Sequence, residues 1–253
     1  MNKETLFVAF STQKGGVGKT ALTVLIASYL HYRQGMNIAI VDCDYPQHSI
    51  AEMRKRDADQ IMSDDHYKRM AFNQFTELNR KAYPVEESDP TNAIESAQKL
   101  IAEGDTHFDI IFFDLPGTLN TQGVVRTLSN MDYIFSPISA DRVVLESTLN
   151  FASSLNDNII SVAKGNIKGL YLLWNLVDGR EKSELYEAYE SVIAELGLPI
   201  LKTFIPDTKR FRREQNTQHR PIFRSTLFPA DNSLIRGSNI DVLSDEILKL
   251  ITE

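Results

Sequence analysis

A glycine-rich stretch between two apolar segments places the strongest constraint on how this chain folds. Residues 10–20 read Phe-Ser-Thr-Gln-Lys-Gly-Gly-Val-Gly-Lys-Thr, preceded by the apolar run Leu6–Phe10 and followed by the apolar segment Ala21–Leu30. A strand, a glycine-rich turn and the start of a helix are the arrangement of a phosphate-binding loop. The glycines let the backbone wrap closely around an anion, and the positive end of the following helix adds to the attraction.

Two residues at the end of this stretch have side chains suited to a nucleotide and its metal ion. Lys19 can reach the β- and γ-phosphates, and the hydroxyl of Thr20 can ligate Mg²⁺. The usual spacing, G-x-x-x-x-G-K-[ST], would place a glycine at position 13, where this chain has Gln13 followed by a second lysine, Lys14. This is the deviant form K-G-G-x-G-K-[ST]. The alternative is a glycine-rich turn with lysines by chance, and the flanking strand and helix argue against it.

In this deviant loop the chain resembles the ParA/MinD family of ATPases. The resemblance implies that ATP and Mg²⁺ are the cofactors, and that Lys14 reaches across a dimer interface to the nucleotide of the partner subunit. Lys14 and Lys19 would then stabilise charge on the transferring phosphoryl group. By the same resemblance, the loop residues that hold the nucleotide are Lys14, Gly15, Gly16, Val17, Gly18, Lys19, Thr20 and Ala21.

Carboxylates follow two further apolar runs. Asn37–Val41 leads into Asp42 and Asp44, and Ile110–Phe113 leads into Asp114. Ligands of open α/β sheets lie beyond the carboxyl ends of the strands, so these acids can face phosphates and Mg²⁺. Asp114 has the Walker B form, in which a buried strand delivers a carboxylate to the water shell of the metal. Two acids in a solvated turn are the alternative for the first pair.

The resemblance extends to the segment after Asp42, which is similar to the switch I motif of the family, D-x-D-P-Q. It implies that Asp44 orients the attacking water and that Asp42 supports the metal shell. Tyr45 is inserted between Asp44 and Pro46 in this chain. A nucleotide-binding scaffold that does not hydrolyse ATP, and binds a protein partner rather than DNA, is therefore the alternative function.

Three residues near the ends of later strands are candidates for contacts with adenine. The family has an asparagine at the end of the strand that corresponds to Gly169–Trp174, and Asn175 stands there. Pro206 and Asp207 follow the strand expected at 201–205 and are secondary candidates by the same resemblance. A proline that ends a strand and an aspartate that caps a helix explain the latter two equally well.

Charge is unevenly distributed along the chain. The net charge is −7, yet residues 202–236 carry eight Lys or Arg against three acids. This asymmetry suggests an anionic partner. The family's short helix at this place binds DNA without sequence preference, and the matching residues are Lys209, Arg210, Arg212 and Arg213, with Arg220, Arg224 and Arg236 as possible extensions. A basic helix that merely balances an acidic protein is the alternative.

The alternation of apolar runs predicts an α/β fold. We expect one domain over 1–253 with the P-loop NTPase fold: a doubly wound, mostly parallel sheet of about seven strands with helices on both faces. The expected strands cover 6–10, 37–41, 110–113, 133–136, 169–174 and 201–205, with a short extended piece at 83–85. The expected helices cover 19–33, 49–59, 64–80, 89–103, 141–162, 181–196 and 238–251.

The composition argues against several other classes of protein. The one cysteine, Cys43, cannot supply a disulfide framework or the cysteines that bridge an iron–sulfur cluster. No apolar run is long enough to cross a bilayer and no signal segment is evident, so we expect a cytoplasmic protein without a membrane partner. A tail with clustered tyrosines or basic residues, as in related kinases or MinD-like membrane proteins, is not predicted.

The resemblance is closest to the TraA-type ParA-like proteins of conjugative transposons, on the runs Asp42–Ser49 and Ser136–Arg142. It implies a homodimer in the ATP state, nonspecific DNA as a partner, and a protein that activates hydrolysis. The expected process is DNA partition, positioning or conjugative transfer.

Overall fold

The computed structural model describes residues 4–104, 106–119, 121–160, 165–180 and 183–252. Its centre is a six-stranded parallel sheet, in the order β3-β2-β4-β1-β5-β6. The strands are β1 (Leu6–Phe10), β2 (Ile38–Asp42), β3 (Val85–Glu87), β4 (Ile110–Asp114), β5 (Tyr133–Ile138) and β6 (Gly169–Trp174). An α/β fold with a parallel sheet is therefore confirmed.

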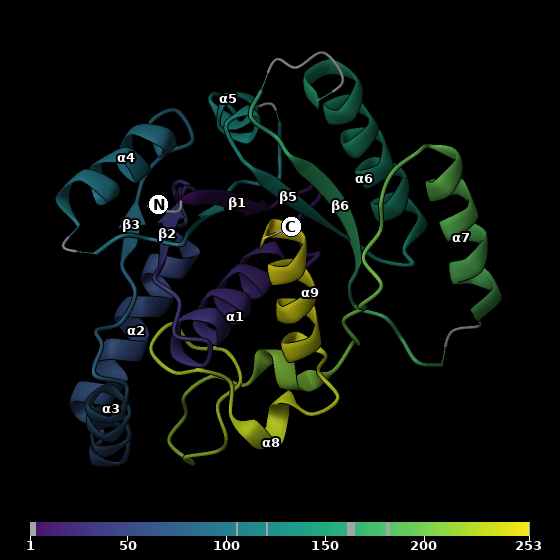
Figure 1. Ribbon diagram of the computed structural model, residues 1–253. Coiled ribbons are helices and arrows are strands. Elements are labelled where there is room, and N and C mark those ends of the chain that lie inside the picture. The colour runs from purple at the N-terminus through teal and green to yellow at the C-terminus, as the bar shows by residue number, and fades with distance from the viewer. Residues whose placement is uncertain (1–3, 105, 120, 161–164, 181–182, 253) are drawn as a thin grey trace.

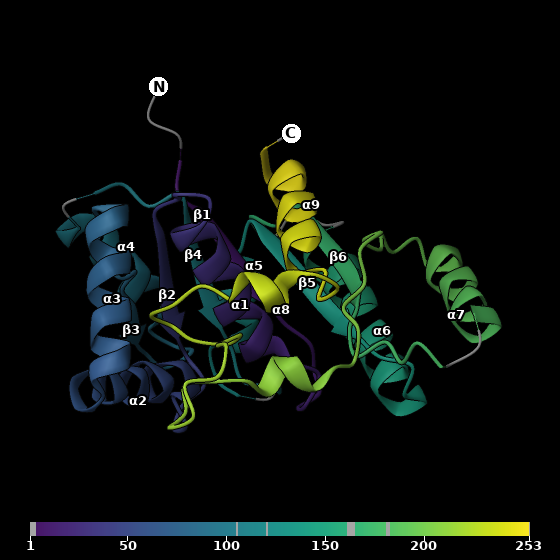
Figure 2. The same ribbon diagram turned by 90° about the horizontal axis from the view of Figure 1, so that it is seen from below.

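Helices cover both faces of the sheet (Figure 1). One face carries α1 (Lys19–Tyr32) and α9 (Ile240–Thr252), and the other carries α4 (Ala93–Glu103), α5 (Val124–Ser129), α6 (Arg142–Leu155) and α7 (Ser183–Glu195). The hairpin of α2 (Ser49–Ser63) and α3 (Asp65–Leu78) packs beside α1 and β3, away from β6 (Figure 2). The sheet is doubly wound, as the sequence predicts.

The central strands β2, β1 and β4 are apolar along their length, except for the aspartate that ends β2 and β4, because both of their sides are buried. Successive side chains of a strand point to opposite faces. Phe112 of β4 accordingly packs in the core on the α1 side, while its neighbours Ile111 and Phe113 pack in the core on the other side. This is the pattern of a parallel strand covered by helices on both faces.

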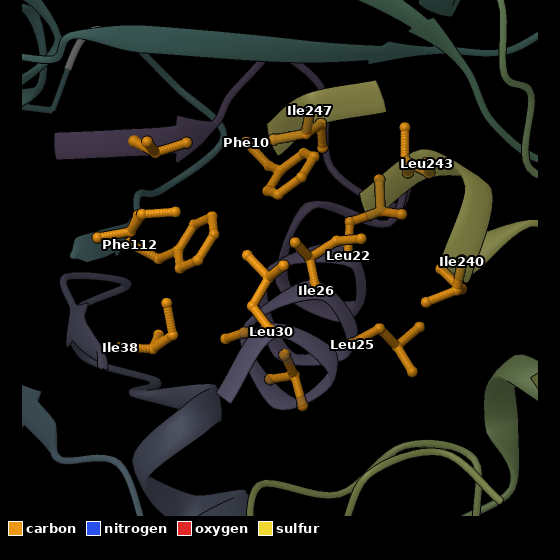
Figure 3. Packing of buried hydrophobic residues seen from close by; sticks show 14 of the residues in the cluster. Phe10, Leu22, Leu25, Ile26, Leu30, Ile38, Phe112, Ile240, Leu243 and Ile247 are labelled. Carbon is orange, nitrogen blue, oxygen red and sulfur yellow. The ribbon is translucent and has the colours of Figure 1, made fainter. Parts of the chain in front are cut away.

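Helix α1 is the most enclosed helix on the first face, and it follows directly from the glycine-rich loop. Figure 3 shows Leu22 and Ile26 of α1 next to Phe10 of the sheet, with Phe112 on one side and Leu243 of α9 on the other. The helix is apolar around most of its circumference, as a helix packed between a sheet and another helix must be. Because α1 is packed in this way, the C-terminal end of the glycine-rich loop, which leads into it, is held in place.

Replacing Phe112 with alanine should lower the free energy of unfolding by about 3–5 kcal/mol, because the ring is fully buried and leaves a cavity. Phe72 of α3 is 70% exposed, so Phe72→Ala should change that free energy by less than about 1 kcal/mol and serves as the matched control. Urea unfolding monitored by circular dichroism measures both. Equal losses in the two variants would contradict the packing described here.

One expected strand is not formed. Residues 201–205 lie beside β6, and Leu201 and Ile205 donate backbone hydrogen bonds to it. Between these two bonds, the backbone N–H groups of Lys202 and Thr203 turn instead to the carboxylate of Glu246, at 2.8 and 2.9 Å. The prediction of a strand here was wrong because a side chain of α9 takes the N–H of Thr203, which would otherwise continue the ladder with β6.

Other boundaries also differ from expectation. The short piece at 83–85 is followed by β3, which pairs with β2, and α5 was not predicted. Helix α4 begins at Ala93 rather than Asp89, because the carboxylate of Asp89 accepts backbone hydrogen bonds in the preceding turn. Helix α6 ends at Leu155 and is followed directly by a π-helical turn over Asn156–Ile160. The end expected for this helix, and the start expected for α7, fall on 161–164 and 181–182, outside the described residues.

Candidate functional site

The glycine-rich loop leaves β1 and enters α1 as the sequence predicts. Gly16 and Gly18 have φ of +80° and +88°, a region that side-chain-bearing residues rarely adopt. Gly18 also has no room for a side chain, because a Cβ there would lie 2.5 Å from Nδ2 of Asn175. The backbone of the loop is thus held in a tight curve at the N-terminal end of a buried helix, where anions bind favourably.

Lys19 is the buried cation of this loop, with 9% of its surface exposed. Its Nζ donates a hydrogen bond to the backbone oxygen of Lys14 at 3.0 Å. Burial lowers its pKa, and the negative charges of Asp114 and Asp44 oppose that shift. A Cβ on Gly117 would lie 3.0 Å from the same Nζ, so the turn after β4 passes directly over the lysine.

Thr20 and Asp114 meet across the sheet edge, since Thr20 Oγ1 donates to Asp114 Oδ2 at 2.8 Å. The other oxygen, Oδ1, is buried and has no hydrogen-bond partner among the described residues. Burial, with the nearby charges of Asp42 and Asp44, raises the pKa of Asp114 to about 7, although the bond from Thr20 opposes this. A hydroxyl, a carboxylate and an unpartnered oxygen are the hard donors that Mg²⁺ prefers, so these residues fit that ion.

The two acids after β2 have different environments. Asp42 is buried, and its Oδ2 accepts backbone hydrogen bonds from Ile50 and Ala51 at 2.9 Å each. It therefore anchors the first turn of α2, and burial raises its pKa. Asp44 is half-buried and lies on the wall of the pocket around the loop. The structure thus brings Asp44 to the loop, while Oδ2 of Asp42 is bonded to the α2 backbone and Oδ1 accepts from the backbone N–H of Asp44 at 3.3 Å.

A pocket of about 450 Å³ opens above the loop. Its wall contains loop residues together with Thr20, one of the predicted metal ligands, and Asp44, the predicted water-orienting residue, whereas Asp42 and Asp114 do not line it. The lining residues are Gly15, Gly16, Gly18, Lys19, Thr20, Ala21, Asp44, Gln47, Leu115, Gly117 and Arg224. Lys14 contributes its backbone beneath Lys19 and does not line this pocket. Sequence reasoning assigned Arg224 only to a basic patch and gave no role to Gln47.

The adenine candidates cluster beside the loop rather than in this pocket. Asn175 is buried, and its Nδ2 donates to the backbone oxygen of Val17 at 2.7 Å. Pro206 forms a bridge with Val177, and the backbone N–H of Asp207 donates to the oxygen of Val177 at 2.9 Å. The three predicted residues are therefore brought together at the end of β6.

The basic run forms a short 3₁₀ helix, Lys209–Arg212, as expected from its position. Lys209, Arg212 and Arg213 are exposed. Arg210 is not, because its Nη1 donates to the backbone oxygens of Leu234, at the end of α8 (Asn232–Ile235), and of Arg236, at 2.7 and 2.6 Å. Three of the four predicted DNA contacts are available at the surface, and the fourth ties this helix to α8.

Sheet, loop and carboxylates together define a P-loop nucleotide-binding protein. The sequence profile described as the CobQ/CobB/MinD/ParA nucleotide binding domain matches residues 8–222. The chain belongs to this family, and the predicted ParA/MinD relationship is confirmed. A search of curated proteins by sequence gives no significant match.

Solved structures share the fold at low identity. MinD from Pyrococcus furiosus is 18% identical with a TM-score of 0.61, and covers 98% of this chain and 100% of its own. The ParA of pNOB8, in a structure bound to nonspecific DNA, is 14% identical with a TM-score of 0.62, covering 98% and 99%. Cobyrinic acid a,c-diamide synthase from Mycobacterium smegmatis, with a bound ATP analogue and magnesium, is 20% identical with a TM-score of 0.58, covering 97% and 95%.

Proposed function

We propose that the chain binds ATP with Mg²⁺ at this pocket, hydrolyses it slowly, and dimerises in the ATP state. The observation that carries the proposal is the unpartnered oxygen of Asp114, buried beside Thr20 and within the charge field of Lys19. A carboxylate oxygen without a partner in such a place is costly unless a cation or its water shell completes it. Related proteins with ATP analogue and magnesium support the choice of ligand.

Phosphoryl transfer depends on positioning and charge neutralisation more than on covalent chemistry. Mg²⁺, when bound, neutralises charge on the phosphate oxygens. Thr20 and Asp114 would hold it, with Asp42 as a more distant support. Lys19 would bind the terminal phosphates, and Asp44 would orient the attacking water from the pocket wall. Asn175, Pro206 and Asp207 would lie against the adenine.

The nucleotide would control assembly through Lys14. Within one chain, Lys14 lies outside the pocket lining while Lys19 lies inside it. A side chain in this position has an anionic target only when a second subunit presents its phosphates. Such a contact differs between the ATP and ADP states, which is what a nucleotide switch requires.

Phosphate release tests hydrolysis directly. The purified chain should release phosphate from ATP with Mg²⁺ and not with EDTA, and sizing by light scattering should show a dimer with Mg²⁺ and a slowly hydrolysed ATP analogue.

The second candidate function is a scaffold that binds ATP without hydrolysing it. It is favoured by the inserted Tyr45, which is 64% exposed between Asp44 and Pro46. Binding without phosphate release would select the scaffold.

DNA is the proposed partner of the basic surface around Lys209, Arg212 and Arg213. Changing all three to glutamine should weaken binding of nonspecific duplex in the ATP state, and should reduce the salt slope of log K by about 2–3. The matched control changes three exposed residues elsewhere, Lys68, Arg69 and Lys99, to glutamine and alters net charge equally. Fluorescence anisotropy at two salt concentrations measures the DNA affinity of both triple variants. Equal weakening in the two would contradict a DNA-binding role for this surface.

The biological setting stays a prediction. Partition, positioning and conjugative transfer are all compatible with an ATP-controlled dimer on DNA, and the sequence resemblance to TraA-type proteins, itself a proposal, favours the last. A single domain over 1–253, a cytoplasmic location and a protein that activates hydrolysis are likewise proposals. Among the described residues, no helix is long and apolar enough to cross a membrane.

A further inference from the structure

An arginine from a distant part of the chain lines the phosphate end of the pocket. Arg224 lies more than 200 positions from the loop, yet it shares the pocket wall with Gly15, Thr20 and Asp44. Its side chain is 25% exposed, which leaves part of the guanidinium accessible. This is the phosphate end because Lys19 and Thr20 line it, whereas Asn175 lies beside the loop at Val17.

The backbone around Arg224 is held by α2. Asp57 of α2 is buried, and its Oδ2 accepts hydrogen bonds from Ser225 Oγ, Thr226 N and Thr226 Oγ1 at 2.8, 2.8 and 2.9 Å. The backbone N–H of Arg224 donates to the oxygen of Arg213 at 3.0 Å. The position of this residue is therefore fixed on both sides before any ligand arrives.

Glu214 also fixes the orientation of the Arg224 guanidinium. Its Nε and Nη2 both donate to Oε1 of Glu214, at 3.0 and 2.6 Å, and Oε2 of Glu214 is paired with Arg56 at 2.9 Å. Among the described residues Nη1 has no hydrogen-bond partner, so part of the donor fork remains available. One carboxylate is shared by two arginines, and the cluster keeps a net positive charge.

From this geometry we infer that Arg224 is a phosphate-binding residue of the nucleotide site, supplied by the same chain and positioned by Glu214. Arginine suits this task because its planar fork binds phosphate oxygens with directed hydrogen bonds while another edge stays on a carboxylate. A side chain fixed in advance loses little conformational entropy on binding. The inference rests on the proposed function, since the anion is the phosphate end of the nucleotide.

Calorimetric titration with Mg²⁺ and a slowly hydrolysed ATP analogue tests the inference. Arg224→Gln should weaken binding by about 10-fold to 100-fold, the value of a hydrogen bond to a charged group. Arg69→Gln is the matched control, because Arg69 is exposed on α3, does not line this pocket and carries the same charge. It should bind the analogue as the unaltered chain does.

If Arg224→Gln binds as tightly as the unaltered chain, the inference is wrong while the proposed function stands. If the unaltered chain itself does not bind the analogue, the proposed function fails, and the inference with it.

A second measurement needs no variant and so does not depend on folding of Arg224→Gln. Phenylglyoxal modifies accessible arginines, and mass spectrometry reports each site. Mg²⁺ with the ATP analogue should slow modification of Arg224 at least several-fold and leave the modification of the exposed Arg69 unchanged. Equal modification of Arg224 with and without nucleotide, in a chain that calorimetry shows to be saturated, would overturn the inference.

Discussion

Asp114→Asn should sharply slow Mg²⁺-dependent ATP hydrolysis and at the same time stabilise the nucleotide-free chain at alkaline pH. The first effect follows because asparagine cannot provide the anionic oxygen that the metal site needs. Loss of one such electrostatic contact lowers turnover by on the order of a hundredfold or more. The second effect follows because the carboxylate is fully buried and one of its oxygens has no partner.

The pH dependence of this stabilisation has a definite sign. The pKa of Asp114 rises from 3.8 to about 7 on folding, so the folded chain binds the proton more tightly than the unfolded chain does. Stability from this group is fully present below about pH 4 and is lost as pH rises through about 7. At pH 8 the charged group costs on the order of 4 kcal/mol, and asparagine removes that cost.

Urea unfolding at pH 5.5 and pH 8, without Mg²⁺ or nucleotide, measures this effect. The gain in Asp114→Asn should be larger at pH 8 than at pH 5.5. Asp59→Asn makes the same chemical change at an exposed site and should show no such difference. A variant of Asp114 that is no more stable at pH 8 than the unaltered chain would contradict the burial and charge described for this site.

Lys14→Ala should leave nucleotide binding by the monomer largely intact and remove both the ATP-dependent dimer and most of the hydrolysis. The Lys14 backbone oxygen that holds Lys19 survives the change, because alanine keeps it. The lost ammonium group would otherwise neutralise charge in the partner's site, so turnover should fall at least about a hundredfold.

Light scattering with the ATP analogue and a phosphate-release assay measure the two effects. Lys55→Ala is the control, because Lys55 is exposed on α2 and carries the same side chain. A Lys14→Ala chain that still dimerises with the analogue and hydrolyses ATP at the unaltered rate would remove the role assigned to Lys14.

The sequence predicted those parts of the site that local patterns encode. The glycine-rich loop, its lysines and the carboxylate after a four-residue apolar run each depend on neighbours in the sequence, and parallel strands bring their carboxyl ends to one edge. Thr20 and Asp114 therefore meet at 2.8 Å as that reasoning requires. Asn175 was identified from the resemblance to the family, and the structure places it at the end of β6 beside the loop.

What the sequence did not predict depends on contacts between distant segments. Residues 201–205 read as a strand, but Glu246 of α9 takes two of the backbone donors. The family resemblance implied that Asp42 supports the metal shell, and only the fold shows that the first turn of α2 bonds to its Oδ2. The sequence assigned Arg224 to a basic surface. In the structure, the segment that contains it packs against α2, which places Arg224 at the pocket.

The central idea is that the loop, Thr20 and Asp114 hold a nucleotide triphosphate and its magnesium ion. Calorimetric titration of the unaltered chain and of Lys19→Ala with an ATP analogue, each with Mg²⁺ and with EDTA, tests it most directly. We expect one site per chain, tighter with Mg²⁺, and affinity at least about a hundredfold weaker in Lys19→Ala. Heat signals indistinguishable from dilution in the unaltered chain, or equal affinity with Lys19 removed, would contradict it.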